Sequence, residues 1–169
     1  NGYKIFYISN LGKCIYTRKE YNDDNYDFES NITSYNLDMS VYEKNPRDFI
    51  ELFKYVDEKS NLNDKSSSKI LSQNIYNLMK KISICLSNNI FQSSNIKKCT
   101  CFQIFGADVI FDNNLHSYLL ELNKGPDMIP RDDIDKNMKK KVQEDMFKIV
   151  GILPENDINS FYEIHKSKL

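Results

Sequence analysis

Apolar and polar residues alternate along the first stretch of the chain, from Tyr3 to Tyr21. Alternation with a period of two is typical of a strand that buries one face. The segment from Asn10 to Lys13 interrupts the alternation and contains a glycine, which favours a tight turn. The sequence therefore predicts an N-terminal β-hairpin, followed by a polar surface loop over residues 21–31.

Three later segments carry apolar residues at helical spacing. The first begins at Asn45-Pro46, with asparagine as cap and proline in the first turn, and ends near Ser60. The second begins at Ser68, after the low-complexity connector 61–68. The third begins at Asp132 or Asp133 and stops at Gly151. The predicted apolar faces are Phe49, Ile50, Phe53 and Val56; Ile70, Leu71, Ile75, Leu78, Met79, Ile82 and Cys85; and Ile134, Met138, Val142, Met146 and Ile149.

Two mainly apolar strands separated by Asn113-Asn114 lie between Cys101 and Asn123. Asparagine tolerates the positive φ angles of a two-residue hairpin turn, so we expect Asp112 to pair with Leu115. Both faces of this hairpin are largely apolar, which is typical of strands that are covered on each side.

The predicted register has a chemical consequence. It places Asp108 opposite Leu119, and alternation then turns Asp108, Glu121 and Asn123 toward one face. Buried carboxylates without a partner are costly, and Mg²⁺ resolves the cost because it takes oxygen ligands, commonly one or two carboxylates together with substrate phosphates. The pattern thus suggests a magnesium site. An alternative stays open, in which Asp108 caps an element or pairs with a lysine while Glu121 lies at a solvated sheet edge.

Composition narrows the class of protein. The chain has 169 residues, 40% hydrophobic and 12% aromatic, which is enough for one packed core, so we expect a single domain over 1–169. The 23 basic and 24 acidic residues leave a net charge of -1, so neither nucleic acid nor a membrane is an expected partner. No run is long enough to span a bilayer, and without a signal peptide or initiator methionine the chain is expected to be a fragment of a longer cytoplasmic protein.

The cysteines and a lysine run offer further candidate chemistry. The chain has four cysteines, Cys14, Cys85, Cys99 and Cys101, and only two histidines, His116 and His165, could join them in a zinc site. Buried free thiols are the preferred interpretation of these cysteines. The run from Lys139 to Lys141 is interpreted as a solvated helix face, with a binding patch as the alternative.

The segment CFQIFGADVIFDNNLHSYLLELNKGP resembles the tubulin-tyrosine ligase family, whose pattern is F-x-x-x-G-x-D, a short turn, and then L-x-E-x-N-x-x-P. The family includes tyrosine ligases, polyglutamylases and polyglycylases with an ATP-grasp fold. The resemblance implies an α+β chain, namely the C-terminal lobe of an ATP-grasp domain, with a mixed, mainly antiparallel sheet flanked by helices. It also implies that Asp108, Glu121 and Asn123 bind Mg²⁺ and ATP.

A second segment, NITSYNLD, looks like the family's H-L-T-N-Y-S-I-N. This likeness implies that Thr33 and Ser34 lie against ATP, and that Tyr35 and Asn36 lie near the incoming amino acid. Asn31 stands where the family has histidine, and Ser34 where it has asparagine.

The predicted first hairpin also resembles a strand pair of the family, but Ile15 stands where an arginine that grips the amino acid's carboxylate is expected. The nearest substitute is Arg18, three residues on and on the other side of the strand. Loss of the bidentate contact between an arginine guanidinium and the amino acid's carboxylate weakens amino-acid binding. The segment from Asp132 to Ile152 resembles the helix of the glutamylase-like members. The resemblance covers most of the chain and is strongest from Cys101 to Ile152.

The function implied by the resemblance is that of an ATP-dependent ligase. It would add glutamate or tyrosine to a protein carboxylate through an acylphosphate, with the C-terminal tail of tubulin or microtubules as acceptor and the cytoskeleton as location. Lys124 would meet phosphate or acyl oxygens, or else be an exposed strand-end charge, and Arg131 with the lysine run would steer the acidic tail. The fragment alone is not expected to be active. The alternatives are a degenerate, tubulin-binding member and a ligase for another acceptor.

Overall fold

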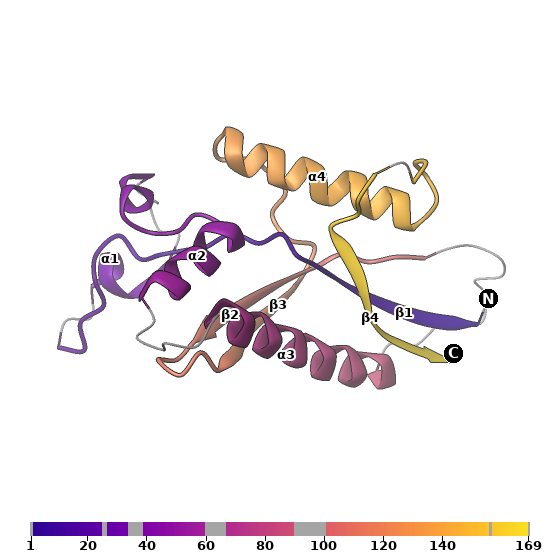
Figure 1. Ribbon diagram of the computed structural model, residues 1–169, viewed down its shortest axis with the longest axis horizontal. Helices are drawn as coiled ribbons and strands as arrows, with labels where there is room; N and C mark the ends of the chain where they lie inside the picture. The colour runs from indigo at the N-terminus through magenta and orange to yellow at the C-terminus, as the bar shows by residue number, and fades with distance from the viewer. Residues whose placement is uncertain are drawn as a thin grey trace. The chain divides into compact units, whose positions relative to one another are not determined.

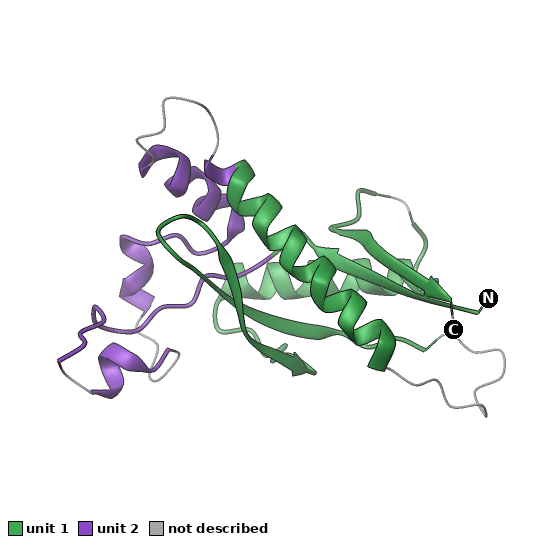
Figure 2. Ribbon diagram, turned by 90° about the horizontal axis from the view of Figure 1, so that it is seen from below, with its two compact units in different colours: residues 1–11, 69–169 green, residues 12–68 purple. Residues whose placement is uncertain are grey.

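The computed structural model describes residues 2–24, 27–33, 39–59, 67–89, 101–155 and 157–168. These residues form two compact units, one of residues 1–11 and 69–169 and the other of residues 12–68 (Figure 2). The first unit holds two antiparallel strand pairs with long helices, so the α+β class predicted from the sequence is confirmed (Figure 1). The elements are β1 (Tyr3–Ser9), α1 (Phe28–Asn31), the 3-10 helix η1 (Met39–Glu43), α2 (Phe49–Lys59), α3 (Ser67–Asn89), β2 (Phe105–Phe111), β3 (Ser117–Lys124), α4 (Asp133–Ile149) and β4 (Phe161–Lys168).

Among the described residues, no helix combines the length and the apolar character that crossing a bilayer requires.

The predicted N-terminal hairpin is wrong, because β1 pairs with the last strand of the chain. β1 and β4 run antiparallel, with Tyr3 opposite Lys168 and Ser9 opposite Phe161. The expected turn instead passes close to α2, since a Cβ atom at Gly12 would lie 2.5 Å from the Phe49 ring. The glycine there permits a close approach rather than a reversal of the chain. A distant strand with the same alternation therefore replaced the local partner that the sequence suggested.

The start of α2 also differs from the prediction. Asp48, not Asn45, caps the helix, because its carboxylate accepts the Glu51 N–H at 2.9 Å. The Glu51 side chain accepts the Arg47 N–H at 2.8 Å, one residue before the cap, and so also holds the segment that enters the helix. Pro46 is buried before the helix, and Ile50 is 60% exposed instead of lying on the packed face.

The helix α3 begins where the sequence predicted and supplies the core of the first unit. Leu71 and Ile75 are buried, as expected of its apolar face. Ile70 and Cys85 are exposed, so their assignment to that face is wrong. The buried stripe is therefore narrower than the one that helical spacing alone predicted.

Both strand pairs contact α3. The Asn74 side-chain N–H donates to the Leu115 carbonyl at 2.8 Å, at the turn between β2 and β3. Lys4 of β1 donates to the Ser87 carbonyl at 2.7 Å, at the other end of the helix. Figures 1 and 2 show the strands of this unit between α3 and α4.

The helix α4 agrees with the prediction at both ends. Asp132 is its N-cap and accepts the Asp135 N–H at 2.7 Å. Gly151, at a φ of 78°, follows its C-terminus in the left-handed conformation that ends many helices.

The thiols differ from the expectation of burial. Cys14 is half-buried, whereas Cys85 and Cys101 are exposed, and all three are free. Burial raises the pKa of the Cys14 thiol to about 11. Cys99 lies outside the described residues.

Candidate functional site

The turn between β2 and β3 is one residue longer than predicted. Phe111 pairs with Ser117 and the Asp112 N–H donates to the His116 carbonyl at 3.1 Å, so Asp112 lies opposite His116 and the predicted register of Asp112 with Leu115 is wrong. The Leu115 N–H does donate to the Asp112 carbonyl at 2.9 Å, but as a bond within the turn. The Asp112 carboxylate accepts the N–H groups of Asn114 and His116, both at 2.9 Å. Leu115 takes the left-handed conformation, with a φ of 64°. Side-chain capping by Asp112 thus stabilises a longer loop than the Asn-Asn pair suggested.

A β-bulge then resets the register. Val109 pairs with Leu119, but Asp108 pairs with Glu121, so Leu120 is the extra residue on β3. The prediction that Asp108 lies opposite Leu119 is therefore wrong. Bulges bend a strand and redirect its side chains, and here the bulge brings the two carboxylates directly opposite each other.

The three predicted metal ligands nevertheless share one face of the hairpin. Directly opposed residues of an antiparallel pair project to the same side, which joins Asp108 to Glu121. Asn123, two residues beyond Glu121, lies on that side as well, opposite Gly106. Asp108 and Glu121 are exposed and Asn123 is half-buried.

This face is open in the described structure, contrary to the expectation that both faces are covered. Ile110 and Tyr118, which oppose each other beside the carboxylates, are each 51% exposed. The opposite face is the packed one, and its half-buried members are Phe105, Val109, Phe111, Ser117, Leu119 and Leu122. The carboxylates therefore lie at the edge of an accessible, partly apolar surface.

The acidic pair has no compensating charge in the described part of the chain, where neither Asp108 nor Glu121 forms an ion pair. Directly opposed residues have Cβ atoms about 4.5–5.5 Å apart, so two carboxylates there repel each other. The described residues contain no helix cap or lysine partner that would make Asp108 structural. A cation between the two acids would offset this repulsion.

The oxygen donors fit magnesium better than zinc. Two carboxylates and the Asn123 amide oxygen are hard ligands of the kind that Mg²⁺ prefers. Among the described residues no group of three or more His, Cys, Asp or Glu side chains is placed to hold a metal. An incomplete oxygen set of this kind suits a metal that also takes oxygens from a phosphorylated substrate.

The other predicted site residues are less informative. Thr33 is exposed and follows Ile32, the C-cap of α1. Ser34, Tyr35 and Asn36 lie outside the described residues. Lys124 is exposed at the end of β3, where alternation turns it to the face opposite Asn123.

The possible substitute for the missing arginine is already engaged. Arg18 lies 3.0 Å from the Glu29 carboxylate, and Lys19 binds the same carboxylate. Ile15 is 45% exposed and brings no charge to the expected position. The described residues of this unit therefore place no uncommitted guanidinium where the resemblance called for one.

The lysine run is structural at two of its three positions. Lys139, only 15% exposed, lies 3.0 Å from the Asp135 carboxylate, and Lys141 lies 2.7 Å from Asp145. Only Lys140, 3.6 Å from the half-buried Glu144, matches the predicted solvated face. The run is thus neither a uniform solvated face nor a cluster of uncommitted cations.

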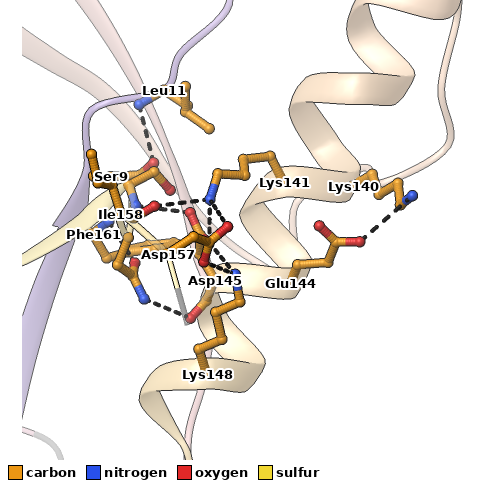
Figure 3. Close-up of polar contacts among 12 residues, drawn as sticks. Ser9, Leu11, Lys140, Lys141, Glu144, Asp145, Lys148, Asp157, Ile158 and Phe161 are labelled. Atoms are coloured by element: carbon orange, nitrogen blue, oxygen red, sulfur yellow. Dashed lines mark hydrogen bonds and ion pairs between the residues drawn. The ribbon is translucent and has the colours of Figure 1, made fainter. Parts of the chain in front are cut away.

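A charged cluster around Asp145 was missed by the sequence analysis (Figure 3). The Asp145 side chain is fully buried and accepts hydrogen bonds from Lys141 at 2.7 Å and from the Ser160 N–H at 2.8 Å. Lys148 lies 3.6 Å away and also binds Asp157. Burial opposes ionisation of Asp145, but the hydrogen bonds from Lys141 and Ser160 outweigh it and lower the pKa to about 2.

The Asp145 cluster attaches the end of α4 to the start of β4. Ser160 also accepts the Asn10 N–H through its carbonyl at 2.8 Å, which links the cluster to the end of β1. The spacing of Lys141, Asp145 and Lys148 on one helix face was visible in the sequence. The return of the chain at Ser160 was not, because it depends on the pairing of β1 with β4.

A family model described as the tubulin-tyrosine ligase family matches residues 3–159. The chain belongs to the tubulin-tyrosine ligase family. The resemblance seen in the segment from Cys101 to Pro126 is thereby confirmed.

Several relatives are named as polyglutamylases. The tubulin polyglutamylase ttll-5 of Caenorhabditis elegans is 28% identical over 134 residues, 76% of this chain and 18% of that protein. The tubulin polyglutamylase TTLL5 of Mus musculus is 36% identical over 56 residues, 33% of this chain and 4% of that protein. The probable alpha-tubulin polyglutamylase Ttll1 of Tetrahymena thermophila is 31% identical over 67 residues, 40% of this chain and 16% of that protein. The chain thus spans less than a fifth of each of these relatives. No solved structure matches it.

Proposed function

We propose that this chain is the C-terminal lobe of an ATP-grasp domain and provides the magnesium- and ATP-binding face of an ATP-dependent amino-acid ligase. The observation that carries the proposal is the pairing of Asp108 with Glu121 on an exposed face, with Asn123 beside them. The family membership agrees with it, since the three residues lie in the motif by which the resemblance was first seen.

We infer a role for each of these residues from its placement. Asp108 and Glu121 would hold the cation between them, and Asn123 would add its amide oxygen. Bound Mg²⁺ would neutralise phosphate charge as the terminal phosphoryl group of ATP moves to the acceptor carboxylate. Ile110 and Tyr118 present apolar surface beside the carboxylates, where the flat nucleobase would exclude water.

The acylphosphate formed in that step would be attacked by an amino group, with phosphate as the leaving group and an amide as the product. Glutamate is the amino acid we propose, because the relatives above are named as polyglutamylases. The acceptor would be an acidic tubulin tail at the microtubule surface, for the same reason. Arg131, 44% exposed at its side chain and 3.9 Å from Asp127, remains a candidate to steer such a tail.

The test uses the full-length protein and the affinity for ATP measured by calorimetry at saturating Mg²⁺. Glu121→Gln should weaken binding by about tenfold or more, equivalent to about 1.4 kcal/mol. Glu163→Gln serves as control, because Glu163 is also an exposed strand carboxylate but lies on β4. Equal affinity of wild type and Glu121→Gln would refute the proposed metal site.

A second candidate is a family member that keeps the fold and binds tubulin without ligating an amino acid. It is favoured by Ile15 at the expected arginine position and by the engagement of Arg18 with Glu29. Incorporation of labelled glutamate into tubulin by the full-length protein separates the two candidates. Binding of ATP and tubulin without incorporation would establish the second.

A further inference from the structure

The chain leaving β3 folds back over the hairpin that carries the acidic pair. Gly125, with a φ of 88°, turns the backbone, and its N–H reaches the Ile104 carbonyl at 3.4 Å. Pro126 then lies on Gly106, where a Cβ atom would be only 2.9 Å from the proline Cβ. Gly106 is directly opposite Asn123 and two residues before Asp108, so the proline occupies the carboxylate face.

The same segment is held at its other end by α4. Lys139 donates to the Ile129 carbonyl at 2.7 Å and pairs with the buried Asp135 carboxylate at 3.0 Å. Asp135 also accepts the Arg131 N–H at 2.9 Å. The segment 125–131 is therefore fixed between Gly106 on β2 and the first turns of α4.

We propose that the contact of Pro126 with Gly106 is a positioning device that holds Asn123 beside Asp108 and Glu121 and closes one end of the metal-binding face. This inference rests on the proposed function, because it assigns a role within the same site. The position of Gly106 requires a residue without a side chain, because Pro126 lies against it. It does not require the backbone freedom of glycine, since the φ of Gly106 is not in the left-handed region. An alanine there adds only a collision with Pro126, which moves the end of β3.

The experiment is a double-mutant cycle in the full-length protein with Gly106→Ala, Pro126→Gly and both together. Two affinities are measured for each form. One is the affinity for ATP in the presence of Mg²⁺, and the other is the affinity for Mn²⁺ in the presence of ATP, measured by electron paramagnetic resonance. Gly106→Ala should weaken both by about 10- to 100-fold, the range typical of changes next to metal ligands. Pro126→Gly should weaken both less, and the double variant should be no weaker than Pro126→Gly, because the collision is gone.

A steric control is available in the other unit. Gly12→Ala brings a Cβ atom to 2.5 Å from the Phe49 ring, so it also forces a neighbour to move. It should lower the melting temperature without selectively changing the affinity for Mn²⁺. Equal affinities in wild type and Gly106→Ala, or additive losses in the double variant, would overturn the positioning role.

Hydrogen exchange separates this inference from the proposed function. In the absence of nucleotide, exchange of the amides of residues 121–126 should be faster in Gly106→Ala and in Pro126→Gly than in wild type. If Gly106→Ala does not fold, Pro126→Gly alone decides, and unchanged exchange and unchanged affinity would refute the role of the contact. If exchange responds but wild type does not bind ATP, the contact is real and the proposed function is wrong.

Discussion

Asp145 and the Asp108–Glu121 pair lie in the same unit but in opposite surroundings. Asp145 is fully buried, accepts hydrogen bonds from Lys141 and Ser160, and has Lys148 nearby. Asp108 and Glu121 are exposed, oppose each other directly, and have no cation partner among the described residues. The first cluster is complete within the chain, whereas the second calls for a positive charge from outside.

This difference gives a criterion for separating structural from functional acids. A buried carboxylate with its partners in place contributes to the folded state, and removing it leaves other charges uncompensated. A pair of like charges on an open face costs stability unless a bound cation offsets the repulsion. The two sites should therefore respond to neutralisation with opposite signs.

The largest effect is expected at the buried site. Asp145→Asn should lower the free energy of unfolding by about 3 kcal/mol, because it leaves Lys141 and Lys148 without their buried counter-charge. Chemical denaturation measures the change. Glu144→Gln is the matched control, one residue away on the same helix, and should change stability by less than about 0.5 kcal/mol because the Lys140–Glu144 pair is accessible to solvent. Equal effects of the two variants would contradict the structural role of Asp145.

The contribution of Asp145 to the free energy of unfolding should depend on pH. Because the pKa of Asp145 is lowered to about 2 on folding, the folded state binds fewer protons than the unfolded state. The stabilisation is present above the ordinary aspartate pKa of about 4, and is lost as the pH falls from there toward 2. Denaturation curves of wild type and Asp145→Asn should therefore converge over this window. A constant difference from pH 6 to pH 2 would refute this assignment.

Neutralising the exposed pair should act in the other direction. In the presence of a chelator, Asp108→Asn or Glu121→Gln should raise the free energy of unfolding by about 0.2–1 kcal/mol, because the repulsion between opposed like charges is removed. The same variants should lose the increase in melting temperature that Mg²⁺ and ATP produce in wild type. A variant that destabilises the chelated protein would show that the acids are structural.

The sequence predicted the shared face of the three hairpin side chains, but not the register of the two strands. Alternation placed Asp108, Glu121 and Asn123 on one face, but the Asp112 cap and the bulge at Leu120 decided which residues oppose each other. Two changes of register, one at the turn and one at the bulge, left the shared face intact. Such local capping and bulging depend on side-chain hydrogen bonds that periodicity does not reveal.

The pairing of strands that are distant in the sequence could not be predicted from the pattern of apolar and polar residues. The segments of β1 and α4 were recognised from their own periodicity and caps, but the pairing of β1 with β4 joins residues at opposite ends of the chain. The Asp145 cluster depends on that pairing, because Ser160 reaches the helix only when β4 lies beside β1. A local turn signal at Gly12 favoured the wrong partner, since glycine also serves close packing, here against Phe49.

The smallest predicted effect is a response to salt. Raising the ionic strength from about 0.01 M to about 0.15 M shortens the screening length from about 30 Å to about 8 Å and weakens interactions between exposed charges. In chelated wild type, this should reduce the repulsion between Asp108 and Glu121 and slow hydrogen exchange of β2 and β3 amides by a small factor. In Glu121→Gln this slowing of hydrogen exchange by salt should vanish, because only one charge of the pair remains. The amides around the buried Asp145 should change little, so an equal response of the two regions would remove the contrast between them.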